Sequence, residues 1–405
     1  MDLEIDYVLE MAPVNIVHVI ASVDPSHGGP SMSGPSLAAA QAALGHRATL
    51  MFHVAPGERL DLSNARATIP ALERVELIGI PQDCLAERIT APRAAAALQA
   101  QLHHADVVHL HGLWDPIVLR AGRLALRAGK PYVISPRGML SPWALKRRRI
   151  EKALIRRWWL DEVLAGSTFV HALNSSEQAS IAALDERWKI RVFANGVFPL
   201  TSQAPYGREQ LTASFPALQG RPYVLFLGRL HTMKGLDYMA DGFAQFAAQC
   251  CDIDLVVAGP DGGARAALEA QIEALNIRSR VHLVGPVFGA SKFALLNNAL
   301  CYLQTSRNEG FSMSILEALN FGLPAVISEQ CFFPEVQTQN VGRVVPLSGE
   351  RIAAALREIC LDRVHRDSMG QRARAFIERD YTWYAVARAM IAAYRAETGS
   401  RHVPE

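Results

Sequence analysis

The sequence predicts an α/β protein with two parallel-sheet domains, and three observations support this prediction. The chain has 405 residues, which is more than one hydrophobic core usually organises, so two domains are expected. Half of the residues are apolar and a fifth are charged, which is enough for two substantial cores. Short runs rich in β-branched residues alternate with longer amphipathic stretches rich in Ala and Leu, a pattern typical of parallel strands connected by helices.

The strand candidates form two series along the chain. In the first half they are 14–23, 48–54, 75–80, 106–112, 131–135 and 167–173. In the second half they are 221–228, 252–259, 280–287, 299–306 and 323–329, with helical segments between them. The segment 195–207 between the series contains turn formers and prolines, and we expect it to link the domains. The two series predict separate Rossmann-like domains over residues 1–198 and 206–380.

Composition excludes several classes of protein. No stretch approaches the ~20 uninterrupted apolar residues of a membrane span. The first residues, "MDLEIDYVLE", are acidic where a secretory signal would be basic. The cysteines form no C-x-x-C pattern, so neither a zinc site nor a disulfide framework is indicated. Because the net charge is only +2, a nucleic-acid partner is not expected. We expect a cytoplasmic protein.

The stretch "TSRNEGFSMSILEALNFGLPAVIS" (305–328) combines the end of a strand, a loop and a helix, and it carries two acids. Glu309 lies at the carboxyl end of the predicted strand, where open parallel sheets bind ligands. Glu317 lies in the following helix and faces the same crevice, with the backbone donors of residues 311–314 between the two acids. One acid can hold sugar hydroxyls and the other ribose hydroxyls. The alternative is that both are capping or surface carboxylates.

A second informative stretch is "VLFLGRLHTMKGLD" (224–237), in which a strand ends at Gly228. Arg229 and Lys234 then flank one turn. Arg offers a planar fork for phosphate oxygens and Lys a mobile point charge, so together they can neutralise a diphosphate without a metal ion. The alternative is a pair of solvated surface cations.

Taken with several other motifs, these two stretches make the chain resemble the retaining glycosyltransferases of family 4, whose GT-B fold has two facing Rossmann-like domains. The resemblance spans Val14 to Tyr394 and rests on the order and spacing of the pieces together. The matching pieces are "HGGP" (27–30), "DVVHLHGLW" (106–114), "SPRGML" (135–140), "ANGV" (194–197), "FLGRLHTMKG" (226–235), "AGPDGG" (258–263), "EGFSMSILEA" (309–318) and "FPEV" (333–336). The resemblance also implies a terminal helix, from about residue 381 to 405, that crosses back to the first domain.

The resemblance assigns roles to individual residues. It implies that Glu309 contacts the donor sugar, that Glu317 holds the ribose, and that Arg229 and Lys234 hold the diphosphate. It further implies contacts from the intervening segment, Gly310, Phe311, Ser312, Met313 and Ser314. In the first domain, Gly28 and Gly29 let a loop approach the diphosphate, and His111 sits by the sugar. One departure is Ser312, where family members often carry Gly, and it affects the local amide geometry.

Some first-domain residues keep alternative interpretations. His109 and His111 lie on one face of a strand. The ring nitrogens of a buried histidine often form hydrogen bonds within the core and have no catalytic role. Arg137 can contact an acceptor phosphate or cap a helix. Asp252 and Asp254 imitate a metal-binding D-x-D pair, yet they begin a predicted strand instead of ending one, so we interpret them as structural.

The reaction that these residues predict is transfer of a sugar from a nucleotide-diphosphate donor to a hydroxyl of a glycan or polyprenyl-linked glycan, in surface polysaccharide synthesis. No first-domain acid stands at a matching strand end, so a front-face return is expected. The diphosphate leaves under Arg229 and Lys234 while His111 and Glu309 support the sugar. We expect no cofactor and no metal. The alternatives are a nucleotide-sugar 2-epimerase, a phosphorylase of related fold and a non-catalytic nucleotide-sugar sensor.

The basic stretch "WALKRRRIEKALIRRWWL" (143–160) is the last candidate. Ile150, Leu154 and Trp158 recur at helical spacing beside the basic face, as in helices that lie on membranes. Its cations are Lys146, Arg147, Arg148, Arg149, Lys152, Arg156 and Arg157. Such a helix can place the protein on the anionic inner face of the cytoplasmic membrane. The alternative is an ordinary helix whose apolar stripe packs on the sheet and whose cations are solvated.

Overall fold

The computed structural model describes residues 12–24, 29–56, 65, 69–146, 149–200, 207–218, 220–250 and 252–399. The chain divides into two compact units. The first comprises Met1–Phe198 and Trp383–Glu405, and the second comprises Pro199–Thr382. The sequence placed the boundaries at residue 198 and at about residue 381.

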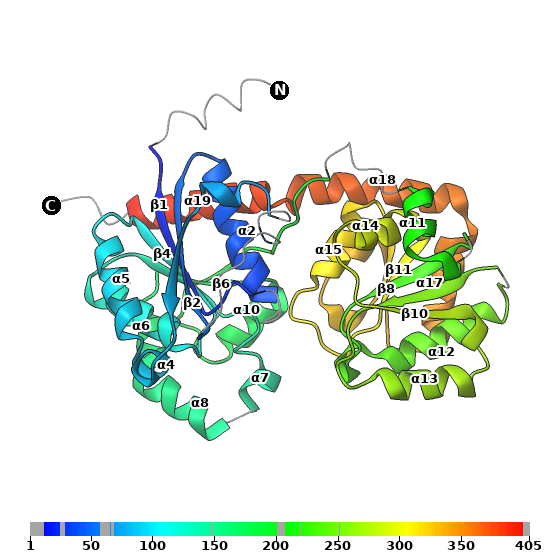
Figure 1. The fold of residues 1–405 in the computed structure, drawn as a ribbon, viewed down its shortest axis with the longest axis horizontal. Coiled ribbons are helices and arrows are strands. Elements are labelled where there is room, and N and C mark those ends of the chain that lie inside the picture. Colours follow the sequence, from blue (N-terminus) through cyan, green and yellow to red (C-terminus); the bar gives the residue numbers. More distant parts are fainter. Residues whose placement is uncertain are drawn as a thin grey trace. The chain divides into compact units, whose positions relative to one another are not determined.

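The first unit contains a parallel sheet with the strand order β3-β2-β1-β4-β5-β6-β7, of which β1, β2, β4 and β6 are labelled in Figure 1. Its strands are β1 (Asn15–Ile20), β2 (Arg47–Val54), β3 (Glu76–Pro81), β4 (Val107–His111), β5 (Tyr132–Ser135), β6 (Phe169–Ala172) and β7 (Ile190–Val192). The central strand β4 is buried along its whole length, because helices cover both faces of a parallel sheet. Its buried polar residues, His109 and His111, therefore need partners inside the protein.

The helices of the first unit connect these strands. They are α2 (Gly29–Ala43), α4 (Leu85–Thr90), α5 (Pro92–Leu102), α6 (Pro116–Arg127), α7 (Pro142–Lys146), α8 (Arg149–Ile155), α9 (Asp161–Ala165) and α10 (Ser175–Ala182). A 3-10 turn, η2 (Leu72–Arg74), and a π-helical turn, η3 (Arg156–Leu160), complete the series. The predicted basic helix over 143–160 is thus divided among α7, α8 and η3, and residues 147 and 148 lie outside the described residues.

The second unit repeats the architecture with the strand order β10-β9-β8-β11-β12-β13, again parallel. Its strands are β8 (Tyr223–Leu227), β9 (Asp254–Ala258), β10 (Val281–Gly285), β11 (Cys301–Gln304), β12 (Ala325–Ser328) and β13 (Gly342–Val345). Its α-helices are α11 (Arg208–Ser214), α12 (Leu236–Ala247), α13 (Arg265–Ala274), α14 (Gly289–Asn298), α15 (Met313–Asn320), α16 (Glu335–Thr338), α17 (Gly349–Leu361) and α18 (Arg363–Asp380). Short 3-10 turns are η4 (Pro216–Leu218), η5 (Thr232–Lys234), η6 (Arg278–Arg280) and η7 (Glu329–Cys331).

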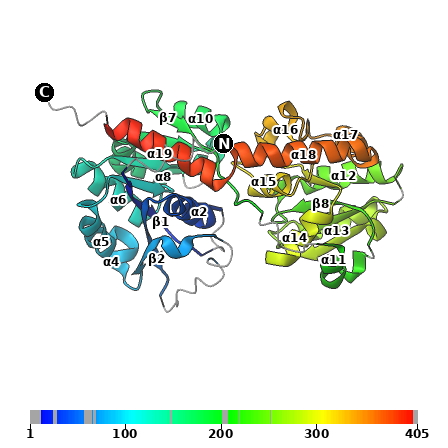
Figure 2. The ribbon, with the colours of Figure 1, turned by 90° about the horizontal axis from the view of Figure 1, so that it is seen from above.

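The last helix, α19 (Trp383–Gly399), packs on the first unit (Figures 1 and 2). Trp383 and Ala387 join a core with Leu37 and Ala40 of α2, and Tyr394 packs among the strands of the first sheet. The predicted α/β class, its two parallel sheets and the return of the terminal helix are therefore confirmed. Trp383 is buried in this core and is a packing residue.

The sequence missed two strands, β7 and β13. Both lie at the edge of a sheet, are short, and include an arginine, Arg191 or Arg343. Edge strands are half-exposed and tolerate charge, so they lack the apolar run that marks a buried strand.

Candidate functional site

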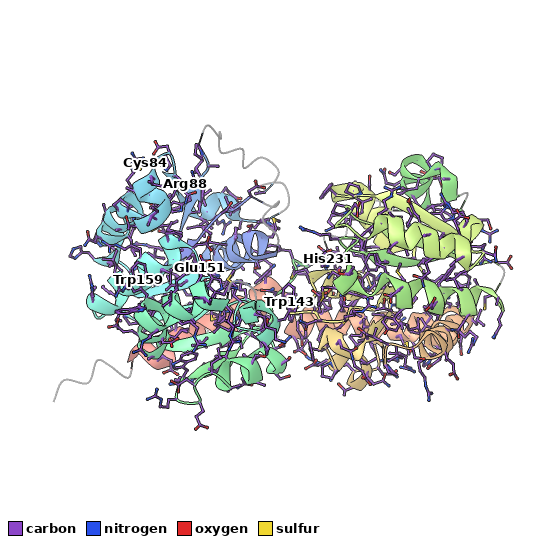
Figure 3. All side chains as sticks on the ribbon, turned by 90° about the horizontal axis from the view of Figure 1, so that it is seen from below. Cys84, Arg88, Trp143, Glu151, Trp159 and His231 are labelled. Carbon is purple, nitrogen blue, oxygen red and sulfur yellow. The ribbon has the colours of Figure 1, made fainter. Side chains whose placement is uncertain are left out.

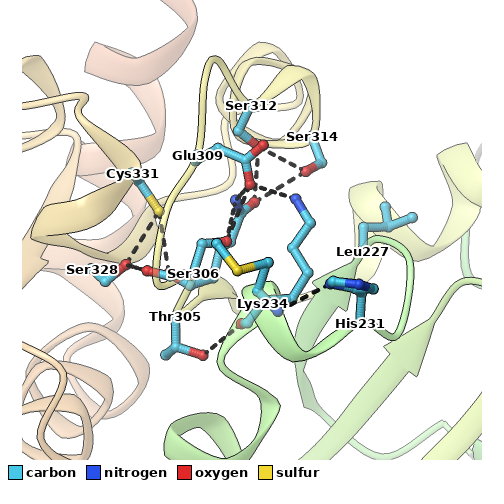
Figure 4. Close-up of polar contacts among 12 residues, drawn as sticks. Leu227, His231, Lys234, Thr305, Ser306, Glu309, Ser312, Ser314, Ser328 and Cys331 are labelled. Carbon is cyan, nitrogen blue, oxygen red and sulfur yellow. Dashed lines mark hydrogen bonds and ion pairs between the residues drawn. The ribbon is translucent and has the colours of Figure 1, made fainter. Parts of the chain in front are cut away.

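The two predicted loops of the second unit meet at the carboxyl ends of β8 and β11 (Figure 4). Lys234 Nζ forms an ion pair with Glu309 Oε2. The same carboxylate oxygen accepts hydrogen bonds from Gln304 Nε2 at 3.0 Å and from Ser306 Oγ at 3.1 Å. Glu309 is therefore held by donors from its own strand end and by a lysine from the neighbouring loop.

Gly235 explains why the two loops lie so close together. Its φ is +60°, and a Cβ there would lie 1.9 Å from the carbonyl oxygen of Thr305. Thr305 Oγ1 also donates to the Gly235 carbonyl at 2.8 Å. Only glycine allows this contact, because a side chain would strain the backbone and strike the end of β11. The turn after Lys234 thus packs directly on the strand that leads to Glu309.

Helix α15 begins at this edge with Ser312 as its N-cap residue. Ser312 has φ −90°, so serine fits here without backbone strain. The glycine that members of the resembled family often carry at this position is not required by the backbone. Its Oγ donates to Gln304 Oε1 at 2.9 Å, and Ser314 Oγ donates to the same oxygen at 3.1 Å. The first amides of a helix have no intrahelical acceptor, so the start of α15 can bind an anion.

Glu317 lies within α15 and has a partner of its own. Its Oε1 accepts from Lys292 Nζ of α14 at 2.8 Å. The E-x7-E pair therefore does not form one cluster in this structure, since Glu309 pairs with Lys234 and Glu317 with Lys292.

Arg229 follows β8 and is exposed. Its guanidinium forms no hydrogen bond or ion pair with any residue that the structure describes. Its aliphatic stem packs against Gly262, where a Cβ would lie 2.7 Å from Arg229 Cγ. The structure thus supports the stem and leaves the charged end open to a ligand.

The predicted residues of the first unit have different surroundings. Gly28 lies outside the described residues. Gly29 begins α2, and no atom of the described residues beyond its chain neighbours lies within 4 Å of the position that its Cβ would take. Open space at Gly29 leaves room for a ligand to approach the backbone. Gly310, on the loop of the second unit, has similar open space.

His111 belongs to a buried chain of hydrogen bonds. Its Nδ1 is 3.0 Å from Arg137 Nη2, and its Nε2 is 2.9 Å from His18 Nδ1. The other ring nitrogen of His18 is 2.7 Å from Gln41 Oε1. Arginine only donates, so His111 Nδ1 accepts and the Nε2–H of neutral His111 donates to His18. Neutral His18 then donates to Gln41. Contact between His111 and a sugar therefore requires one of its two bonds to be exchanged.

A second chain runs from helix α19 through the sheet. His171 Nε2 donates to the Phe193 carbonyl at 2.7 Å, so His171 Nδ1 accepts from Ser135 Oγ at 2.5 Å. Ser135 in turn accepts from His109 Nε2 at 2.7 Å, and His109 Nδ1 accepts from the Tyr394 hydroxyl at 2.6 Å. The rings of His109 and His111 stack at 4.3 Å, which agrees with their predicted placement on one face.

Burial keeps all four histidines neutral. Burial, together with a smaller effect of the Arg137 charge, lowers the pKa of His18 to about 4 and that of His171 to about 3. The pKa values of His109 and His111 also fall well below the usual range, because of burial first and neighbouring histidines and Arg137 second. The hydrogen-bond directions above are those that neutral rings allow.

Two groups of residues have side chains of the types that bind metal ions. The ligand atoms of His18, His109 and His111 lie within 4.8 Å of one another, but these rings bond to protein partners and Arg137 adds a positive charge beside them. Asp254 is buried and accepts from Arg221, Arg280 and His282 at 2.8–3.0 Å. It is an ion-pairing residue at the start of β9, as its position suggested, and its surroundings oppose a cation.

Sequence reasoning missed the residues that connect the site. Gln304 is buried and joins Ser312 and Ser314 to Glu309, and Tyr302 donates to Gln304 Oε1 at 2.8 Å. A polar residue at the end of an otherwise apolar strand was the available signal. Lys292 gave no signal, because its pairing with Glu317 depends on how α14 packs beside α15.

Two family descriptions match this chain, one on each unit. "Glycosyl transferase 4-like domain" matches residues 28–196, and "Glycosyl transferases group 1" matches residues 207–376. The chain therefore belongs to the family 4-like, group 1 glycosyltransferases, which have the GT-B fold.

Curated relatives include a GDP-mannose:cellobiosyl-diphosphopolyprenol α-mannosyltransferase of Xanthomonas campestris, 26% identical over 78% of this chain and 80% of that protein. Two further matches are shorter. The D-rhamnosyltransferase WbpZ of Pseudomonas aeruginosa is 34% identical over 32% of this chain and 31% of its own. The match with the 2-deoxystreptamine N-acetyl-D-glucosaminyltransferase of Niallia circulans covers only 28% of that protein.

Solved structures share the whole fold. Anabaena HepE in complex with UDP and glucose has a TM-score of 0.69 at 17% identity, covering 95% of this chain and all of HepE. WaaG, a glycosyltransferase involved in lipopolysaccharide biosynthesis, has a TM-score of 0.63 at 20% identity and similar coverage. At these identities the likeness concerns the fold alone.

Proposed function

We propose that the protein is a retaining hexosyltransferase that moves a sugar from a nucleotide-diphosphate donor to a hydroxyl of a glycan or polyprenyl-linked glycan. The observation that carries the proposal is the meeting of Lys234, Glu309 and the start of α15 at one sheet edge. A lysine and unpaired helix amides suit a diphosphate, and a carboxylate suits sugar hydroxyls. The UDP bound to HepE and the GDP-mannose and polyprenol in the name of the Xanthomonas relative support the donor and acceptor classes.

The residue roles in this proposal are those that the family resemblance implies. Arg229 and Lys234 stabilise the departing diphosphate, and Glu309 orients the donor sugar. Glu317 holds the ribose, with Lys292 fixing its carboxylate. The segment from Gly310 to Ser314 lines the sugar and phosphate. In the first unit, Gly28 and Gly29 lie along the diphosphate and His111 supports the sugar.

Turnover separates this function from its alternatives. With donor alone, slow release of free sugar and nucleoside diphosphate supports the transferase, whereas interconversion of the donor sugar supports a 2-epimerase. Phosphorolysis of a glycan supports a phosphorylase. Tight donor binding without turnover across an acceptor panel supports a sensor. A role in surface polysaccharide synthesis follows if polyprenyl-linked glycans are the accepted substrates.

We expect transfer to need no metal ion, because Arg229 and Lys234 supply positive charge for the leaving diphosphate. Activity measured with excess chelator equals activity without it. Loss of activity in the chelator, with recovery on adding magnesium or manganese, contradicts this expectation.

A membrane-facing surface fits a lipid-linked acceptor, and we place it at α7, α8 and η3. Ile150, Leu154 and Trp158 are 79%, 55% and 67% exposed, so the alternative in which this stripe packs on the sheet is wrong. Trp143 and Trp159 are exposed on the same segment (Figure 3). Among the described cations, Lys146, Arg149 and Arg157 are exposed beside this apolar surface.

The structure contains no helix, among the residues that it describes, that is long and apolar enough to cross a bilayer. The exposed apolar side chains and cations of α7, α8 and η3 lead us to propose peripheral attachment at the inner face of the cytoplasmic membrane. Interfacial tryptophans and apolar side chains insert shallowly, and each lysine or arginine near an anionic leaflet adds ~1 kcal/mol.

Vesicle cosedimentation tests this attachment. We expect the protein to sediment with anionic but not neutral vesicles, because the cations need negative headgroups, and to release in high salt. Changing Ile150, Leu154 and Trp158 together to Ser abolishes sedimentation. The matched control is Val364→Ser, which removes an 82% exposed side chain from α18 and leaves sedimentation unchanged.

Changing the arginines tests the electrostatic part alone. Replacement of Arg147, Arg148 and Arg149 by Gln weakens sedimentation with anionic vesicles; the first two lie outside the described residues. Equal recovery with both vesicle types, or no effect of either triple change, leaves a solvated surface as the interpretation.

A further inference from the structure

Arg137 has an unusual backbone for an arginine. It follows β5 at the carboxyl edge of the first sheet and has φ +52°, in the left-handed region that favours glycine. A non-glycine residue in this region stores strain, and such strain persists where the surrounding structure fixes the residue for a purpose. Arg137 lies in the turn between β5 and α7.

The guanidinium of Arg137 lacks a negative partner. Nη1 donates to Asn195 Oδ1 at 2.9 Å and Nη2 to His111 Nδ1 at 3.0 Å, and both acceptors are neutral. Its Nε is enclosed and has no partner. The charge of Glu177 favours the arginine cation, but the Glu177 oxygens accept from the amides of Gly138 and Leu173. Among the described residues, no carboxylate forms an ion pair with Arg137.

A half-buried guanidinium that forms no ion pair and leaves its Nε without a partner is costly, so its retention needs a reason. The hydrogen-bonded chain of Gln41, His18 and His111 holds this cation in one orientation. Gln41 Oε1 accepts a hydrogen bond from His18 Nε2, and His18 Nδ1 accepts one from His111 Nε2. His111 Nδ1 therefore carries no proton and can only accept from Arg137. A proton on His111 Nδ1 would point at the guanidinium and break the bond.

We propose that Arg137 is a preformed site for a phosphate group and that His111, His18 and Gln41 are positioning residues that hold its guanidinium. The planar fork suits phosphate oxygens, and Arg137 keeps N–H groups that no described residue uses. The turn leads directly into α7, whose Trp143 is 56% exposed, so Arg137 lies next in sequence to the surface that we assign to the membrane.

Two molecules can supply such a phosphate, a lipid-linked acceptor or the nucleotide donor. This choice rests on the proposed transferase function, but phosphate binding itself needs no turnover. Failure of the transferase proposal and failure of the Arg137 proposal therefore give different results. If the protein is not a transferase, Arg137 still binds phosphate. If the Arg137 proposal is wrong, the protein still transfers or hydrolyses the donor, but Arg137 does not bind phosphate.

Titration of the full chain with farnesyl phosphate and with UDP tests the site. We expect Arg137→Gln to weaken farnesyl phosphate binding by about ten- to a hundredfold, the value of one charge-assisted contact, and to leave UDP binding unchanged. Arg229→Gln does the reverse. Weakened UDP binding with unchanged farnesyl phosphate binding in Arg137→Gln retains the site and assigns the phosphate to the donor. Arg187→Gln, which changes an exposed arginine of the same unit, alters neither affinity.

The histidine chain has a separate test, which also covers a failure of Arg137→Gln to fold. His111→Asn keeps an acceptor near the position of Nδ1 and retains farnesyl phosphate affinity, whereas His111→Ala loses about tenfold. Arg137→Lys keeps the charge without the fork and binds more weakly than the wild type. Equal affinity of the wild type and all Arg137 and His111 variants for both probes overturns the proposal, and a preference of the wild type for glucuronate over phosphate overturns the phosphate assignment.

Discussion

Replacing Lys234 by Ala lowers turnover at saturating donor by about a hundred- to a thousandfold, the loss typical when one stabilising group at a developing charge is removed. Two effects add in this variant. The departing diphosphate loses a cation, and Glu309 loses its ion-pair partner at the end of β11. Arg229→Ala shows a similar fall, because its exposed guanidinium is free to meet the phosphate. Glu309→Gln also impairs transfer, because the variant lacks the carboxylate that orients the donor sugar.

Steady-state kinetics with saturating donor measures these losses. The matched control is Arg265→Ala, which removes an exposed cation that pairs with Glu269 on α13 and leaves turnover within about twofold of the wild type. Wild-type turnover in either Lys234→Ala or Arg229→Ala disproves the role assigned to that cation. Circular dichroism of each variant shows that the second unit remains folded.

Acid destabilises the first unit steeply between pH 6.5 and pH 4. His18, His109, His111 and His171 have lowered pKa values in the folded chain, whereas unfolded histidines titrate near 6.5. The unfolded chain therefore binds more protons, and stability that is complete above pH 6.5 is lost as the pH falls through the folded pKa values of about 4 for His18 and about 3 for His171. Each such histidine contributes a slope of up to about 1.4 kcal/mol per pH unit.

Other groups near the chain modify this slope in known directions. Arg137 stays charged and opposes protonation of the rings. Burial raises the pKa of Glu177, so that group takes up a proton in the folded state and offsets part of the loss at low pH. Burial raises the pKa of Tyr394, whose hydroxyl faces His109, so it stays protonated throughout.

Urea unfolding at several pH values between 8 and 4 measures the slope, with fluorescence or circular dichroism as the readout. His171→Asn lowers the slope by about one proton, and His103→Asn, at an exposed histidine, leaves it unchanged. A free energy of unfolding that stays constant from pH 6.5 to pH 4.5 contradicts the expectation.

Part of the candidate site is local in sequence and was predictable. Glu309 lies just past the end of β11 and Lys234 just past β8, and parallel strands deliver their following loops to the same edge. Position in a strand-loop-helix unit was enough to select these residues. The start of α15 beside Glu309 followed from the same pattern.

Their partners were not predictable, because each comes from a distant segment. Lys292 reaches Glu317 from α14, and Gln304 connects Glu309 to two serines only once α15 packs on β11. The sequence predicted that both acids face one crevice, with one acid holding the sugar and the other the ribose. Packing decided that each acid pairs with its own lysine.

The difference between what the sequence determines and what the tertiary structure decides is clearest in the first unit. By itself the sequence determined the alternation of strands and helices, the buried strand that carries His109 and His111, and their common face, since period-two alternation is a property of consecutive residues. Only the tertiary structure decided what those rings do. His18, Arg137 and Tyr394 come from three other parts of the chain, so ring tautomers, proton affinities and the unpaired charge of Arg137 arise from contacts that no local pattern encodes.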